Sequence, residues 1–269
     1  MRVKTVRLPD FDGVELKEAA FRGQVFPTHF HETFSVSIVE SGLEKLTTES
    51  RELFVPAGSI VLLNPLQSHA SSCFGDATLR YKSLYISPDG LRFLQRQQPA
   101  RQPGLPWIES VVIENPTLFS LIQHLHATAE PGNAPQFTRC FQHLLAHYAG
   151  AKPSSETRPN GHEATLDEIK ERLKGGGTGK ITVEKLAAEF KISKFRLIRD
   201  FKHSTGLTPI AYLILHRIEQ AKRMLRTDLS LTEIALETDF YDQSHFIHCF
   251  RKYVGVVPSA YRKGLDSWE

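Results

Sequence analysis

A twelve-residue pattern occurs twice in the carboxyl-terminal half of the chain, and this repeat limits the possible folds more than any other feature. The stretch "FKHSTGLTPIAY" (201–212) returns 49 residues later as "FRKYVGVVPSAY" (250–261), with Phe, Gly, Pro and Tyr at the same offsets. Upstream, "LAAEF" (186–190) corresponds to "IALET" (234–238) at a spacing of 48 residues, which predicts one extra residue inside the second copy. Similarity at a fixed spacing indicates two copies of one small helical unit.

Helix-start signals support this interpretation. Thr182, Ser193 and Asp242 are placed as N-caps, and Ser230 with Glu233 forms a capping box. Pro209 stands at a helix start, where its missing N–H costs nothing. The helix it begins is predicted to run to about residue 226 as a rigid strut between the copies, with its apolar stripe formed by Ile214, Ile218, Ala221 and Leu225.

Each copy is predicted to form a helix-turn-helix, in which the second helix has one core side and one outward side. In the first copy Leu197 and Phe201 occupy the core side, and the outward side carries Phe195, Ile198, Arg199 and Lys202. In a major groove, apolar side chains can meet thymine methyl groups while Arg binds guanine. The same outline also occurs in helical hairpins that pack only for stability, so that alternative stays open.

The stretch from 186 to 263 reads "LAAEFKISKFRLIRDFKHSTGLTPIAYLILHRIEQAKRMLRTDLSLTEIALETDFYDQSHFIHCFRKYVGVVPSAYRK". It resembles the DNA-binding domain of AraC/XylS-type transcription regulators. The resemblance implies two helix-turn-helix units that enter successive major grooves of double-stranded DNA. It assigns base reading to Phe195, Ile198, Arg199, Ser244, His245 and His248. Phosphate contacts fall to Lys194, Lys202, Arg251 and Lys252.

Two residues depart from the family pattern. Asp239 replaces the glycine that usually precedes Phe240, and Asp tolerates a left-handed turn less readily than Gly. His248 stands where Arg is frequent, which leaves the base preference of the second groove open.

The amino-terminal half has a different pattern. Residues 25–87 contain short β-branched and aromatic runs separated by Gly, Pro and Ser, which predicts a β-sandwich or jelly roll. Between residues 115 and 150 two amphipathic helices are expected, with apolar stripes that predict a dimer interface or, alternatively, packing onto the β-structure. We therefore expect a multidomain α and β protein, with a sensor and dimerisation domain (1–150), a linker (151–163) and an all-α tandem helix-turn-helix domain (164–269).

The segments "THFHETFSVSIVESG" and "VPAGSIVLLNPLQSH" resemble the cupin-like sensor domain of the same family. The resemblance and the clustering of polar groups predict a pocket for a small polar effector lined by His29, His31, Glu32, His69 and Tyr85. The alternatives are histidines that serve only the surface or the core, and a domain that serves only oligomerisation.

A metal site is not predicted. A metal-binding cupin needs a Glu four or five residues beyond the second His, and Ser35 and Val36 stand there. An unbroken strand would also place His29 and His31 opposite the apolar face of residues 34–38, unless a bulge near Glu32 turns them inward. The alternative function, a metal-dependent cupin enzyme fused to a helical domain, would need that site.

Composition and charge agree with an intracellular regulator. From residue 164 onward 18 Lys and Arg stand against 14 Asp and Glu, so the basic excess belongs to the repeated half. Three distant cysteines support neither disulfides nor a metal knuckle, and no apolar run reaches membrane-spanning length. We expect a cytoplasmic, ligand-sensing homodimer that binds DNA and RNA polymerase and no membrane, acts as an activator, and has no cofactor and no catalytic residues.

Overall fold

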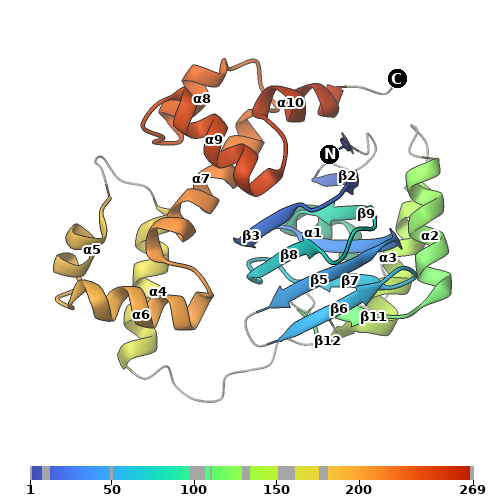
Figure 1. Cartoon of the computed structure of the whole chain (residues 1–269), viewed down its shortest axis with the longest axis horizontal. Coiled ribbons are helices and arrows are strands. Elements are labelled where there is room, and N and C mark those ends of the chain that lie inside the picture. The colour runs from blue at the N-terminus through green and yellow to red at the C-terminus, as the bar shows by residue number, and fades with distance from the viewer. Residues whose placement is uncertain are drawn as a thin grey trace.

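The computed structural model describes residues 2–7, 13–48, 51–96, 107–109, 111–128, 134–150, 161–175 and 181–266. Figure 1 shows a β-rich sensor domain beside an all-helical domain. The expected fold class is confirmed. Most of the expected linker lies outside the described residues, and helix α4 already begins at Gly161, three residues before the expected domain start.

Two antiparallel sheets face one another in the sensor domain. The larger has the order β1-β2-β9-β4-β7-β11, and the smaller has the order β3-β8-β5-β6. The strands of the larger sheet are β1 (Arg2–Arg7), β2 (Val14–Phe21), β9 (Leu79–Ile86), β4 (Phe34–Ser41), β7 (Ile60–Leu63) and β11 (Val112–Ile113). Those of the smaller are β3 (Val25–His29), β8 (His69–Cys73), β5 (Leu43–Thr48) and β6 (Glu52–Pro56), and β10 (Trp107–Ile108) pairs with β12 (Ala149–Gly150). Strands β1 and β2 extend the β-structure beyond the expected range of 25–87.

Helices cover the outer face of the larger sheet. Helix α1 (Pro88–Arg96) follows β9, and α2 (Pro116–Ala127) packs against α3 (Ala134–Tyr148) and against strands β4 and β9. The apolar side chains Leu118, Ile122, Phe137 and Phe141 are at most 1% exposed in a core shared with the sheet. The apolar stripes of α2 and α3, which suggested a dimer interface, are therefore buried inside the sensor domain. This agrees with the alternative expectation that the helices pack onto the β-structure.

The helical domain contains seven helices, all among the described residues. They are α4 (Gly161–Lys174), α5 (Val183–Glu189), α6 (Lys194–Thr205), α7 (Pro209–Met224), α8 (Leu231–Glu237), α9 (Gln243–Val254) and α10 (Pro258–Asp266). The expected caps are confirmed: Thr182, Ser193 and Asp242 accept from backbone N–H groups, and Ser230 with Glu233 forms the capping box. Helix α7 ends two residues earlier than the sequence indicates.

The two helix-turn-helix units differ in the length of their turns. Four residues (190–193) join α5 to α6, and five (238–242) join α8 to α9, so the extra residue of the second copy lies in its turn. Asp239 adopts the left-handed conformation expected of it, with φ of 55°, and Lys191 does the same at the equivalent place with φ of 54°. The tight turn is thus built twice without glycine.

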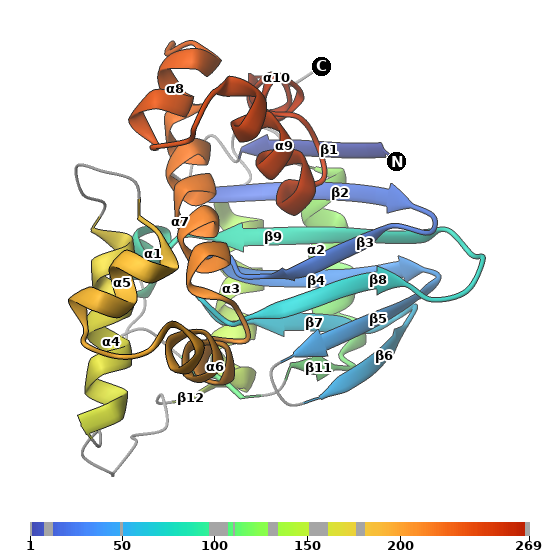
Figure 2. The same ribbon diagram turned by 60° about the vertical axis from the view of Figure 1, so that its left-hand side comes forward.

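Helix α7 lies along the sensor domain, with one helix-turn-helix unit at each of its ends (Figure 2). Phe30 follows β3 in the sensor domain, but its side chain packs in the core of the helical domain, where it is 1% exposed. Its ring centroid lies 5.2 Å from that of Tyr212 and 4.9 Å from that of His216, both on α7. One aromatic side chain of the sensor domain therefore completes the core of its neighbour.

Removing this side chain should weaken the docking of the two domains. We expect Phe30→Ala to lower the free energy of unfolding by about 3 kcal/mol, because a buried ring is replaced by a cavity. The matched control is Phe54→Ala, because Phe54 is 52% exposed, and it should cost less than about 1 kcal/mol. Urea denaturation measures both, and equal losses would contradict the role assigned to Phe30.

Candidate effector cavity and DNA-reading helices

Helix α6 presents an exposed face that carries residues predicted to contact DNA. Phe195 is 75% exposed although it is a large apolar residue, and Lys194, Arg199 and Lys202 are exposed beside it. Ile198 is half-buried. On the opposite side Leu197 and Phe201 are fully buried, as the sequence predicts.

Helix α9 presents a more polar face. Ser244, His248, Arg251 and Lys252 are exposed, in agreement with an outward position. His245 is half-buried, and its ring packs edge-on against Phe240 with the centroids 5.5 Å apart. Of the three residues on this helix that are predicted to read bases, His245 therefore has a ring that packs against the protein.

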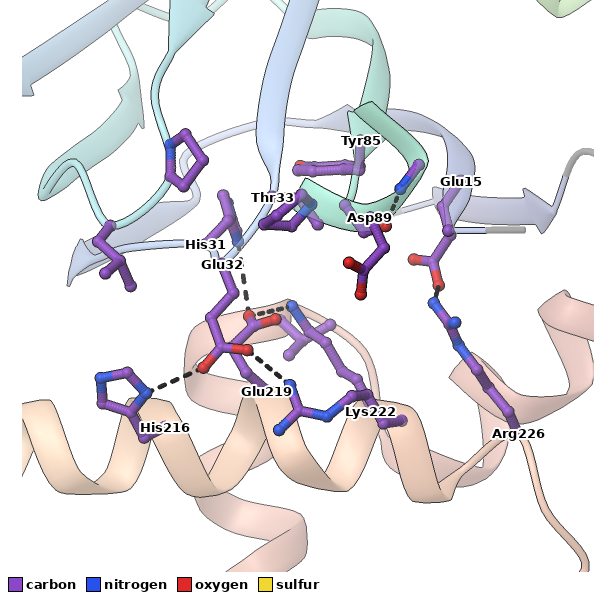
Figure 3. A pocket seen from close by; sticks show the side chains of 18 of the residues that line it. Glu15, His31, Glu32, Thr33, Tyr85, Asp89, His216, Glu219, Lys222 and Arg226 are labelled. Carbon is purple, nitrogen blue, oxygen red and sulfur yellow. Dashed lines mark hydrogen bonds and ion pairs between the residues drawn. The ribbon is translucent and has the colours of Figure 1, made fainter. Parts of the chain in front are cut away.

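A cavity of about 960 Å³ lies between the sensor and helical domains (Figure 3). Sensor residues from β2, β9 and the connection after β3 form one wall, and residues of α7 form the other. Its charged lining residues are Glu15, Lys17, Glu32, Asp89, Arg92, Lys174, Glu219, Lys222, Arg223 and Arg226. A ligand in this cavity would touch both domains at once.

Ion pairs and hydrogen bonds cross this cavity and hold α7, Arg226 beyond its end, and α10 to the sensor domain. The Glu32 carboxylate accepts from His216 Nδ1 at 2.9 Å and pairs with Arg223 at 2.5 Å. Glu15 pairs with Arg226 at 2.5 Å and accepts from the Tyr261 hydroxyl at 2.8 Å. We call Glu15 and Glu32, with the partners just named, the interdomain latch.

The pKa of Glu32 reflects these contacts. Burial pushes the pKa up, but the hydrogen bond from His216 and the charge of Arg223 outweigh burial and the nearby Glu219, and they hold it below its ordinary value of 4.5. The carboxylate is therefore ionised at neutral pH, as the latch requires.

Lys17 differs from the other cations of the cavity. It donates to the Val254 carbonyl at 3.4 Å, and within the described part of the chain it has no ion pair with a carboxylate. Burial, helped by the charge of Lys222, lowers the pKa of Lys17 to about 8. An anion bound beside Lys17 would stabilise its charged form and raise its pKa again.

The predicted effector residues divide between two cavities. His31, Glu32 and Tyr85 line the interdomain cavity. His29 and His69 line a smaller cavity between the two sheets, which His31 and Tyr85 also reach.

The bulge near Glu32 that was considered as a way to turn His29 and His31 inward does not occur. Strand β3 ends at His29 and β4 begins at Phe34 in the other sheet, and the register irregularity lies between Phe26 and His29. The chain passes from one sheet to the other at this point, so no single strand fixes the directions of His29 and His31.

Sequence reasoning missed the helical wall of the cavity. His216, Glu219, Arg223 and Arg226 recur at helical spacing opposite the apolar stripe of α7, a pattern that also describes an ordinary solvated face. The helical spacing of these polar residues is visible in the sequence. Only the docked structure shows that they line a cavity and do not face solvent.

The arrangement defines a class of protein in which a β-sandwich with a ligand cavity is docked on two helix-turn-helix units. Residues 12–156 match the family described as AraC-like ligand binding domain, and residues 186–264 match a helix-turn-helix domain family. None of the described helices has the length and apolarity needed to span a membrane.

Similar proteins agree with both matches. The chain is 30% identical to the uncharacterized HTH-type transcriptional regulator YbfI of Bacillus subtilis, over 84% of this chain and 83% of that protein. It is 28% identical to the HTH-type transcriptional activator RhaS of Klebsiella pneumoniae, over 90% and 89% of the two chains. Among solved structures, unsaturated fatty acid-bound ToxT from Vibrio cholerae superposes with a TM-score of 0.59 at 16% identity, covering 95% of this chain and 96% of ToxT.

The chain belongs to the AraC-type family of transcriptional regulators. It is a DNA-binding transcription regulator with an amino-terminal ligand-binding domain, as the sequence predicts.

The latch gives the docking of the domains a pH dependence. Because the folded-state pKa of Glu32 is lowered, its stabilisation is present above pH 4.5 and is lost as the pH falls through the folded value. Glu32→Gln should therefore lower the free energy of unfolding by roughly 1 kcal/mol near neutral pH and by much less near pH 3. Urea denaturation at the two pH values measures both losses.

A matched control removes a carboxylate elsewhere in the sensor domain. Glu52→Gln breaks a pair with Lys45 of the neighbouring strand and should change stability little at either pH. A Glu32→Gln loss that is as large in acid as at neutral pH would contradict the latch.

Proposed function

We propose that a small molecule bound in the interdomain cavity changes how the sensor domain holds α7, and thereby changes DNA binding and transcription. The observation that carries this proposal is the composition of the cavity wall, which comes from both domains. A ligand shifts an equilibrium only by its differential affinity for two states, with couplings of about 1 to 3 kcal/mol. A ligand that touches Glu32 and α7 binds the docked and undocked arrangements differently.

The chemistry of the cavity favours an effector with an acidic group. Among the described cations that line the cavity, Lys17 is the one without a carboxylate within ion-pair distance. Lys222, which pairs with Glu219 at 2.6 Å, lies close enough to lower the pKa of Lys17, and the charges of Glu15 and Glu219 oppose that effect. ToxT, which shares this fold, has been solved with an unsaturated fatty acid bound. A carboxylate near Lys17 and Lys222, with the rest of the molecule in the cavity, fits both observations.

The DNA-binding face comprises the outward sides of α6 and α9. Phe195, Ile198 and Arg199 read bases in one major groove, and Ser244, His245 and His248 read bases in the next. Lys194, Lys202, Arg251 and Lys252 contact phosphates. The exposure of Phe195 supports this assignment, because a large apolar side chain gains nothing from water.

The remaining parts of the proposal rest on the family. The chain acts in the cytoplasm as an activator that contacts RNA polymerase, as RhaS is named an activator, and it responds to its effector without catalysing a reaction. Homodimerisation belongs to the same expectation, although the apolar stripes of α2 and α3 do not support it because they are buried within the sensor domain. The sensor unit is residues 1–150 and the DNA-binding unit begins near residue 161.

Base reading by α6 is tested with two variants of the full chain. Arg199→Ala should weaken the free energy of binding to the preferred DNA site by about 1 to 3 kcal/mol and reduce discrimination at one base pair. Lys202→Ala should lower the affinity for all DNA sequences by a similar factor and reduce the salt dependence of binding. If Arg199→Ala weakens specific and random duplexes equally, Arg199 does not read a base.

Effector binding is tested with matched ligands. A panel of medium-chain and long-chain carboxylic acids should raise the melting temperature of the full chain, and the corresponding primary amides should not. Lys17→Met should raise the dissociation constant for the acids by about tenfold or more, which is the loss expected for one charge-assisted contact. The melting-temperature shift at a given acid concentration should fall accordingly.

Lys45→Met is the control variant, since Lys45 lies on β5 outside the residues that line the cavity. Equal shifts by acids and amides, or a Lys17→Met variant that responds like the parent chain, would rule out an acidic effector at Lys17.

A further inference from the structure

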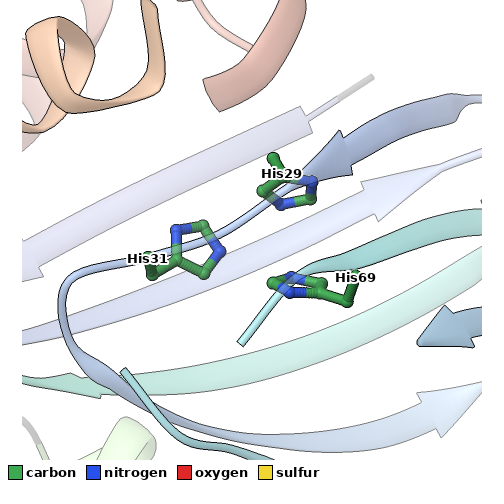
Figure 4. A group of neighbouring side chains, drawn as sticks. All are labelled: His29, His31 and His69. Atoms are coloured by element: carbon green, nitrogen blue, oxygen red, sulfur yellow. The ribbon is translucent and has the colours of Figure 1, made fainter. Parts of the chain in front are cut away.

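Three histidines of the sensor domain converge on the smaller cavity between the two sheets (Figure 4). His29 ends β3, His69 begins β8, and His31 lies on the connection to β4. One ring nitrogen from each histidine lies within 4.8 Å of one from each of the other two. The ring centroids are 4.3 to 5.3 Å apart.

The contacts on the other side of each ring fix which nitrogen faces the centre. His29 Nδ1 lies 2.8 Å from the Pro27 carbonyl oxygen, and His69 Nδ1 lies 3.0 Å from the Gln67 carbonyl oxygen. A carbonyl only accepts, so each Nδ1 carries the hydrogen and each Nε2 carries a lone pair. A metal-binding histidine is oriented in this way, by donating its second N–H to a carbonyl or carboxylate.

His31 faces a carboxylate, at a distance longer than a hydrogen bond. Its Nδ1 lies 3.8 Å from Glu219 Oε1 on α7. All three rings thus turn Nδ1 toward a protein oxygen, although the oxygens come from three different segments. The Nε2 lone pairs of His29 and His69 are both acceptors, so these two nitrogens cannot hydrogen-bond to each other.

The protonation states agree with this geometry. Burial lowers the pKa of all three histidines, to about 4 for His69. The charges of His69 and His31 lower the pKa of His29 further, and those of Lys222 and His69 lower the pKa of His31 further. The imidazoles are therefore neutral near pH 7, which is the form that binds metal.

We propose that His29, His31 and His69 bind one divalent transition-metal ion, of the kind that imidazole ligands favour, such as Zn²⁺. Three protein ligands leave at least one coordination position open. A tetrahedral site with ordinary metal–nitrogen bonds needs nitrogens about 3.4 Å apart. The nitrogens lie within 4.8 Å of one another, so the longest separation must shorten by about 1.4 Å. His31 can make that movement, because it lies outside both neighbouring strands.

The contraction has a consequence for the interdomain cavity. His31, Lys17 and Tyr85 line both cavities, so the metal lies beside the effector, and its open position suits an anionic ligand. Phe30 and Glu32 flank His31 and contact α7, so a shift of His31 is transmitted to the helical domain. This consequence rests on the proposed effector cavity, whereas metal binding itself does not.

The test uses the full chain after treatment with a chelator. Titration with Co²⁺ should give one equivalent of binding with the visible absorption of a four- or five-coordinate ion, and Zn²⁺ should displace it. His29→Ala and His69→Ala should each weaken binding by about 100-fold or more. His124→Ala should bind like the parent chain, because His124 is exposed on α2.

Two further measurements separate the alternatives. His143 and His147 form another close pair, with ring centroids 4.4 Å apart, so loss of Co²⁺ binding in His143→Ala/His147→Ala would overturn the proposal. X-ray absorption of the Zn²⁺-loaded parent chain should count three imidazole ligands, and this readout needs no variant to fold. Fewer than three imidazoles, no stoichiometric Co²⁺ binding, or unchanged binding in His69→Ala would each refute the site. Carboxylic acid binding measured on the chelated protein tests the proposed effector separately.

Discussion

The burial of Phe30 in the helical domain is the contact on which the rest of the arrangement depends. An aromatic side chain contributes more through burial than an exposed ion pair does through charge, so the ring anchors the domains and the latch orients them. Phe30 lies in the four residues 29–32, and each of these has a different neighbour. His29 and His31 face the cavity between the sheets, and Glu32 pairs with His216 and Arg223 on α7. This short segment therefore joins the cavity between the sheets to α7 through adjacent residues.

The sensor domain touches both reading units, which gives the docking a functional meaning. The Ser68 hydroxyl donates to the Thr205 carbonyl at the end of α6 at 2.5 Å, and α10 packs on β1. At the same place Gly206 has φ of 71°, and a Cβ there would lie 3.4 Å from Ser68 Cβ, so the C-cap glycine serves both the helix end and the domain contact. Because α7 connects the two units and lies along the sensor domain, the docked state fixes both helix-turn-helix units relative to one surface.

Local patterns account for what the sequence predicted well. The repeat and the caps at Ser193, Ser230 and Asp242 are set by residues a few positions apart, and they located the helices and the extra turn residue. The docking of the domains depends on contacts between residues about 190 positions apart, such as Glu32 with Arg223, which no local period encodes. For that reason the sequence pointed to Glu32, which lines the interdomain cavity, but missed α7 as the opposite wall. The sequence predicted that His29, His31 and His69 line one pocket. It left the directions of His29 and His31 open, because a single strand over 29–38 would point them away from the apolar face, whereas the chain changes sheets after His29.

The central claim, that Phe30 fixes the helical domain on the sensor domain, is tested most directly by a distance between the two. Spin labels can be attached at two exposed positions, Phe54→Cys on β6 and Leu236→Cys on α8, in a chain with the half-buried Cys73 replaced by serine. Double electron–electron resonance should give one narrow distance distribution when Phe30 is present and a broad one in Phe30→Ala. The same narrow distribution in both proteins would show that the docking does not depend on this side chain.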